Sequence, residues 1–340
     1  MFFVHVAGHW IAPAAMNGIS SDVYGDEGIL IVTGNEILRI GMKLLGWSEK
    51  QLKQQSKKYD AKHIYWFTAN FGASPLVVVH VWKAMQRTDV ADAQIDNATL
   101  DELSNLLFTF HFLKVHPTEG QQQDDWHMHV CDQKLSDDIW KMLLRIQALK
   151  IETIVWPPTE EIGDTVWIGT IDSTHVKTEE PKHPKLSQEE SNHPNLSKDA
   201  LSYKHHAPAF VYEIVVSLWS SRIIWMRGPF LAETSGIQMF STRGGLMKKL
   251  QKTNVKLIAH HGYKGFDEIL SRPNSYDSPD VKKFKSRALM RHQAVIAKIK
   301  TLLCTDGFCH HDKSKFKICF EAAVVITQYR MEISEPVFDI

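Results

Sequence analysis

The sequence contains 340 residues, with 39 Lys and Arg, 39 Asp and Glu, and 44% hydrophobic residues. These values are close to ordinary globular usage, and the length is sufficient for two domains and a sizeable core. No uninterrupted apolar stretch reaches the ~18 residues of a membrane span. The opening segment lacks the basic residues that begin a signal peptide. The four cysteines show no disulfide framework, as is typical of a reducing compartment. We therefore expect a soluble protein with no membrane partner.

Residues 1–158 are expected to form a mainly helical region. Residues 56–87 have a helical pattern with a break at 71–75, where Ser74 and Pro75 are suited to the cap and first turn of a new helix. A helix, a turn containing glycine and a second helix form the outline of a helix-turn-helix. The same outline fits any helical hairpin, and the sequence leaves both interpretations open.

Two further helices are expected in this region. The residues Thr-Leu-Asp-Glu at 99–102 form a capping box, in which a Thr caps a helix and a Glu three residues later reaches back. Ser136 is expected to cap the next helix, because apolar residues follow it at helical spacing. Those residues are Ile139, Leu143 and Ile146.

The prolines at 157–158 mark a domain boundary, because proline is excluded from helix and sheet interiors. The stretch at 166–175 then combines an apolar run with one carboxylate, Asp172. Val, Ile and Trp favour a half-buried strand, so Asp172 is expected at the edge of the core. Such a carboxylate suits a divalent cation, which prefers oxygen ligands. An Asp that simply ends a strand fits the same pattern.

The segment that contains Asp172 resembles the first catalytic strand of the PIF/Harbinger-type DDE transposases, which carries Asp-Gly-Thr-His. Here the sequence reads Asp-Ser-Thr-His from residue 172 and Glu-Glu-Pro from residue 179. Other segments similar to the family follow in the family's order. They are residues 212–214, 222–225, 228–230, 255–265, 291–293 with Lys300, 308–312, 320–322 and 328–329. The resemblance covers residues 165–340, roughly half of the chain.

This resemblance implies an α/β, RNase H-like domain over residues 159–340, built as a mixed sheet flanked by helices. A polar loop at 182–206 is expected between the first two strands. Members of the family hold two divalent metal ions, Mg²⁺ or Mn²⁺, with three carboxylates, and cleave DNA. Here Asp172 matches the first carboxylate, but His260 stands at the second position and Gln293 at the third.

Two of the three implied catalytic residues therefore carry no negative charge. The implied catalytic set is Asp172, His260 and Gln293, of which Asp172 and His260 are the candidate metal ligands. A neutral histidine binds Mg²⁺ poorly and binds Mn²⁺ or Zn²⁺ better. The resemblance thus implies a nuclease fold whose metal site has lost two carboxylates.

Charge is distributed unevenly along the chain. Residues 241–330 contain 18 Lys and Arg against 7 Asp and Glu, while residues 87–180 contain 7 against 18. The basic part suits a phosphate backbone, and equally suits attraction to the acidic part within the molecule. DNA is therefore an expected partner. The expected nucleic-acid contacts are Lys204, Arg287, Arg291, Lys298 and Lys300.

Three functions remain open at this point. The first is a transposase-derived protein of the DDE endonuclease superfamily, located in the nucleus, which lacks efficient nuclease activity and acts through DNA or a protein partner. The second is an active metal-dependent endonuclease that tolerates these ligands or uses others. The third is a decaying element copy with no selected function. A zinc site at Cys304, Cys309, His310 and His311 is disfavoured by the spacing of these residues.

Overall fold

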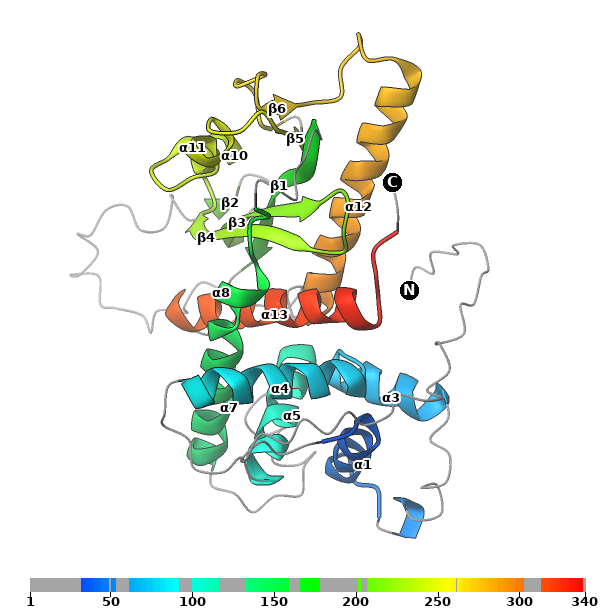
Figure 1. Cartoon of the computed structure of the whole chain (residues 1–340). Coiled ribbons are helices and arrows are strands. Elements are labelled where there is room, and N and C mark those ends of the chain that lie inside the picture. The colour runs from blue at the N-terminus through cyan, green and yellow to red at the C-terminus, as the bar shows by residue number, and fades with distance from the viewer. Residues whose placement is uncertain are drawn as a thin grey trace, which may run out of the picture.

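The structure is a computed structural model that describes residues 32–48, 50–52, 61–91, 100–115, 132–158, 166–177, 201–202, 207–260, 262–302 and 313–338. Helices make up the regular structure described before residue 158, and strands and helices follow it (Figure 1). The helices of the first part are α1 (Gly34–Leu44), α3 (Ala61–Phe71), α4 (Pro75–Ala91), α5 (Leu100–Val115), α7 (Asp132–Ala148) and α8 (Lys150–Thr153).

The break between α3 and α4 lies where the sequence predicts it. Gly72 has a φ of +73°, which glycine adopts without strain. The Val77 N–H donates to the Ser74 hydroxyl at 3.5 Å, and Pro75 occupies the first turn of α4. The two helices are bent by 55° at this break. The helix-turn-helix interpretation of this pair stays a prediction. No single described helix combines the length and apolar composition of a membrane span, although α3 and α4 counted together do.

The prediction that Ser136 caps the start of α7 is wrong. The helix begins at Asp132, so Ser136 lies inside it and does not cap it. The extra turn brings Leu135 into the core, where it is buried, and this burial outweighs the capping preference of a serine. The predicted apolar face is confirmed, because Ile139, Leu143 and Ile146 are buried.

The second half of the chain forms a mixed β-sheet flanked by helices, as expected. The described strands are β1 (Trp167–Lys177), β2 (Leu201–Ser202), β3 (Ala207–Ser217), β4 (Ile223–Leu231), β5 (Lys256–Ala259) and β6 (Leu270–Ser271). β1 pairs antiparallel with β3, which pairs antiparallel with β2 and β4. On its other side β1 pairs parallel with β5, and β5 with β6. Figure 1 shows the sheet beside the long helix α12.

Helices cover both faces of this sheet. α12 (Pro279–Leu302) and α13 (Lys313–Ile333) pack on one face, where Tyr212 of β3 stacks on Phe320 of α13 at 3.9 Å between ring centroids. The short helices α10 (Gly236–Ser241) and α11 (Met247–Leu250) pack on the other face. Alternating residues of each strand point to opposite faces. The residues of β1 therefore divide into a set that faces α12 and a set that faces α10 and α11.

α13 is apolar all round because both of its sides are buried. One side packs on the sheet, and the other packs into the core of the N-terminal helices, as the red helix in Figure 1 shows. Two polar side chains of α13 bind these two parts. Glu321 accepts from Lys150 at 2.8 Å, and the oxygen of Gln328 accepts from the Ile223 N–H at 2.6 Å. A boundary at residue 158 stays a prediction, since α13 contributes to the cores on both sides of it.

Candidate functional site

The structure brings two of the three predicted catalytic positions into contact and places the third just after the neighbouring strand. The last pair between the parallel strands β1 and β5 is Ile171 with Ala259, so Asp172 is the next residue of β1 and His260 directly follows β5. Ile258 packs against Ala288 of α12, and strand alternation directs His260 to the same side. The Gln293 Nε2 of α12 donates to the Asp172 Oδ2 at 2.8 Å. Asp172 and Gln293 are thus in direct contact, and His260 follows the strand that pairs with β1.

Both oxygens of the Asp172 carboxylate accept hydrogen bonds from N–H groups. Oδ2 accepts from Gln293, and Oδ1 accepts from the backbone N–H of Ser173 at 2.8 Å. Gln293 and His260 are exposed, and Asp172 is half-buried. A glutamate in place of Gln293 would repel Asp172 unless a cation lay between the two carboxylates. The amide of Gln293 instead provides a donor that satisfies Asp172 without a cation.

The residues present do not fit a two-metal site. Within the described part of the chain, no group of three or more His, Cys, Asp or Glu side chains is placed to hold a metal ion. Asp172 and His260 offer one carboxylate and one imidazole, with the amide of Gln293 as a weak third group. Two divalent ions need more negative charge than one carboxylate supplies. The candidate zinc residues Cys304, Cys309, His310 and His311 lie outside the described residues.

His292 fixes the helix that carries Gln293. Its ring is fully buried, and its Nδ1 lies 2.9 Å from the Thr170 hydroxyl and 3.2 Å from the Thr170 carbonyl oxygen. Burial lowers the pKa of His292, while the charge of Asp172 and the bond to Thr170 act in the opposite direction. The contact ties α12 to β1 one residue before Gln293, and so holds the amide of Gln293 against Asp172.

Two of the predicted nucleic-acid contacts have structural roles instead. Arg291 is 2% exposed, and its guanidinium donates to the carbonyl oxygens of Phe338 and, at 2.6 Å, Ser220. Lys298 is in an ion pair with Glu335 at 2.8 Å. The prediction that Arg291 binds DNA is therefore wrong, because no phosphate can reach its guanidinium. The charge of Lys298 is neutralised by the carboxylate of Glu335 within the molecule.

The other predicted contacts have different outcomes. Arg287 and Lys300 are exposed on α12, where a phosphate group can reach them. Lys204 lies outside the described residues. The assignment of these three residues to nucleic-acid binding stays a prediction.

A buried acid that sequence reasoning missed lies behind Asp172. Glu213 of β3 is fully buried and pairs in register with Ser173 of β1. One carboxyl oxygen accepts from the Trp225 indole at 3.1 Å, and the other has no partner among the described residues. The Arg227 guanidinium donates to other oxygens, those of residues 239, 242 and 243. The sequence signal was a single charged residue inside the apolar strand at 209–216.

Burial raises the pKa of the Glu213 carboxyl to about 7, while the hydrogen bond from Trp225 and the charge of Arg227 act in the opposite direction. Burial also raises the pKa of Tyr263, and the carboxyls of Glu213 and Asp172 add to that rise. Strand alternation places Glu213 and Ser173 on the face opposite Asp172. The carboxyl of Glu213 is therefore not a replacement for either of the two missing carboxylates.

We expect the Glu213→Gln variant to be more stable than the natural protein at pH 7 and above. The pKa of Glu213 in the folded state, about 7, exceeds the ordinary 4.5. The folded state therefore keeps a proton that the unfolded state has released, and stability falls as pH rises from 4.5 to 7 and then levels off. Glutamine is neutral at every pH, so the variant avoids a loss on the order of 3 kcal/mol. Denaturant unfolding at pH 5, 6, 7 and 8 measures the difference. A difference independent of pH would contradict the account.

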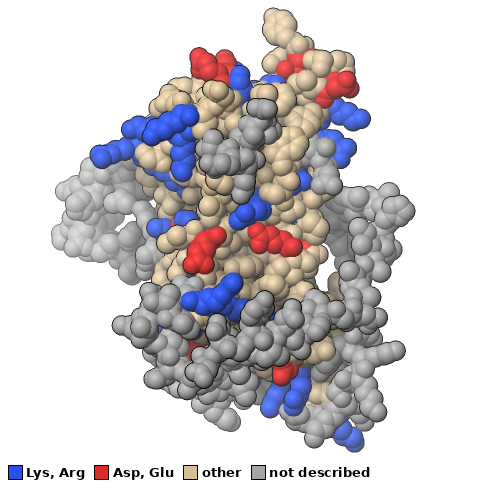
Figure 2. Space-filling model, viewed as in Figure 1, with Lys and Arg blue, Asp and Glu red and all other residues tan. Residues whose placement is uncertain are grey.

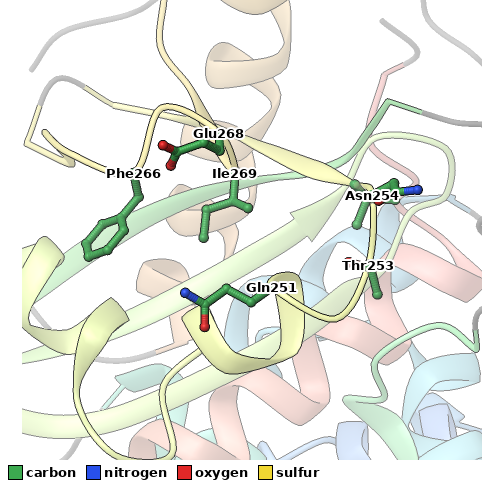
Figure 3. A pocket seen from close by; sticks show the side chains of 7 residues that line it. Gln251, Thr253, Asn254, Phe266, Glu268 and Ile269 are labelled. Carbon is green, nitrogen blue, oxygen red and sulfur yellow. The ribbon is translucent and has the colours of Figure 1, made fainter.

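A separate hollow of ≈ 440 Å³ lies near the other end of β5. It is lined by Gln251, Thr253, Asn254, Val255, Phe266, Glu268 and Ile269 (Figure 3). Val255 immediately precedes β5, whereas His260 immediately follows it. Since these are opposite ends of the strand, the hollow is not part of the Asp172 site.

Comparisons with protein-family models, with curated proteins and with solved structures give no match for this chain. The resemblance to the DDE transposases thus rests on the ordered segments of the sequence. The geometry around Asp172 is an observation that does not depend on that resemblance.

Proposed function

We propose that the chain is a transposase-derived, RNase H-like protein of the DDE endonuclease superfamily that binds DNA without cutting it efficiently. The RNase H-like part of the proposal is supported by the order of the elements. With the two-residue strands β2 and β6 set aside, β1, β3, β4, a helical segment, β5 and α12 follow one another as strand, strand, strand, helix, strand, helix. The family-like segments at 212–214, 228–230 and 291–293 lie on β3, β4 and α12, and the segment at 308–312 lies outside the described residues.

The hydrogen bond between Gln293 and Asp172 is the observation that carries the proposal. It joins Asp172 and Gln293, which match the first and third family positions, across 121 residues of sequence. In this bond Asp172 contacts a neutral amide where the family has a third carboxylate. Catalysis of phosphoryl transfer depends on positioning and on neutralising charge with metal ions. A site assembled in this way, with one carboxylate in place of three, supports binding without efficient cleavage.

Binding to DNA is supported by the surface charge of the sheet half. Figure 2 shows Lys and Arg side chains around the α10–α11 region and beside α12, with fewer acidic groups among them. Among the described residues from 232 to 302, nine exposed Lys and Arg outnumber four exposed Asp and Glu. The nine are Arg243, Lys248, Lys249, Lys252, Lys264, Lys282, Lys283, Arg287 and Lys300. This surplus of positive charge suits a phosphate backbone. A DNA-bound role would place the protein in the nucleus.

Fluorescence anisotropy with a labelled DNA duplex tests the proposal. We expect binding at low salt that weakens steeply between 50 and 200 mM salt, because released counterions drive it. The double variant Arg287→Ala, Lys300→Ala is expected to bind more weakly and with a shallower salt dependence. The matched control is Lys43→Ala, Lys62→Ala, which removes two exposed lysines from the N-terminal helices. The absence of duplex binding at 50 mM salt, or equal losses in both variants, would contradict the proposal.

A further inference from the structure

The turn between β3 and β4 presents an exposed tryptophan in a fixed position. Trp219 is 64% exposed. Its indole N–H donates to the Trp167 carbonyl oxygen at 2.9 Å. The backbone N–H groups of Trp219 and Ser220 both donate to the Ser217 hydroxyl at 3.2 Å. The ring is thus held in one orientation while much of its surface faces solvent, where a large apolar group gains nothing for stability.

The first half of α12 runs along this turn and brings cations to it. The Trp219 ring lies 6.5 Å from the ring of Phe284, and the Arg291 guanidinium binds the Ser220 carbonyl. Arg287 is exposed, and it lies between these two contacts, about one helical turn from each. The exposed Lys283 precedes Phe284 directly.

The local charge is positive. The exposed charged residues on the first half of α12 are Asp280, Lys282, Lys283 and Arg287, one acid against three bases. Phe338, whose carbonyl is also bound by Arg291, is 44% exposed. Lysine is depleted in protein–protein interfaces, whereas exposed aromatic rings among cations are typical of surfaces that bind single-stranded nucleic acid.

We propose that Trp219 is a stacking platform for unpaired bases of a nucleic acid strand, whose phosphates are bound by Arg287 and Lys283. The inference rests on the proposed DNA binding and adds a preference that the charge alone does not supply. Bases can stack on an aromatic ring only where they are unpaired, so the platform favours a single strand or a melted end over a duplex. Cations bind the backbone of either form.

The test compares a labelled 20-nucleotide oligo(dT) with a blunt 20-base-pair duplex at 50 mM salt. Trp219→Ala is expected to weaken oligo(dT) binding about tenfold, as the loss of one stacked base predicts, and to change duplex binding less than twofold. Trp219→Phe loses the hydrogen bond to Trp167 but keeps an aromatic surface, so it should retain most of the affinity for oligo(dT). The control Tyr65→Ala removes an aromatic side chain, 75% exposed, from α3 and should change neither affinity.

The outcomes separate this inference from the proposed function. If no nucleic acid binds to the natural protein, both fail. If the duplex binds but Trp219→Ala leaves the oligo(dT) affinity unchanged, the stacking platform alone is overturned. Equal losses in Trp219→Phe and Trp219→Ala would overturn it as well, because the hydrogen bond and not the ring would then matter. Unchanged oligo(dT) binding by Trp219→Ala, together with a smaller oligomeric state than that of the natural protein, would overturn it and assign the ring to contacts between copies of the chain.

Discussion

The Arg291→Ala variant is expected to be less stable than the natural protein by about 3 kcal/mol. The guanidinium is buried and donates to the carbonyl oxygens of Ser220 and Phe338, which come from two distant segments. Alanine leaves both acceptors without these donors and removes the packing of a long side chain. Denaturant unfolding followed by circular dichroism measures the loss.

Arg287→Ala is the matched control for this prediction. Arg287 lies one turn earlier on α12 and is exposed, so its removal should change stability by less than about 0.5 kcal/mol. Its removal should instead weaken DNA binding. If Arg291→Ala were as stable as the natural protein and lost only DNA affinity, the structural role given to Arg291 would be wrong.

The double variant His260→Asp, Gln293→Glu is expected to gain measurable Mg²⁺-dependent nicking of plasmid DNA. It restores the charge and the oxygen ligands that two divalent ions need. Each ~1.4 kcal/mol of transition-state stabilisation is a factor of ten, so ~4 kcal/mol from a restored metal site corresponds to about a thousandfold. Quantifying the nicked product against time on agarose gels measures the gain.

A stability measurement accompanies this test. Without metal, three clustered carboxylates repel one another, so the double variant should melt at a lower temperature than the natural protein. Mg²⁺ should restore that loss in the double variant and have little effect on the natural protein. Asp172→Asn in the double-variant background should remove both the nicking and the response to Mg²⁺. A double variant that is stable without metal and unresponsive to Mg²⁺ would mean that the three positions do not form one site.

The sequence predicted the elements around the candidate site where local periodicity and order along the chain determine the structure. A strand carries Asp172, a strand ends immediately before His260, and a helix carries Gln293. Asp172 lies in the middle of its strand, however, and does not end it. Each of these elements has a recognisable apolar pattern, and the resemblance placed them in one fold. Periodicity does not identify the helix at 313–333, because both of its sides are buried and its polar residues do not mark a solvent face.

The sequence failed where a side chain's environment depends on distant segments. Arg291 and Arg287 look alike in the sequence, but the partners of Arg291 lie 47 and 71 residues away. Nothing in the sequence indicated the raised pKa of Glu213, because that pKa depends on the burial of its strand under the helices that cover it.

Incubation of the natural protein with supercoiled plasmid and Mg²⁺ tests the central claim most directly. The claim is that the site is assembled but lacks the charge to use metal ions, so we expect no nicking above that of Asp172→Ala prepared in parallel. The Gln293 amide bound to Asp172 and the imidazole of His260 are the reasons for this expectation. Robust Mg²⁺-dependent nicking by the natural protein that is lost in Asp172→Ala would contradict it and establish an active nuclease.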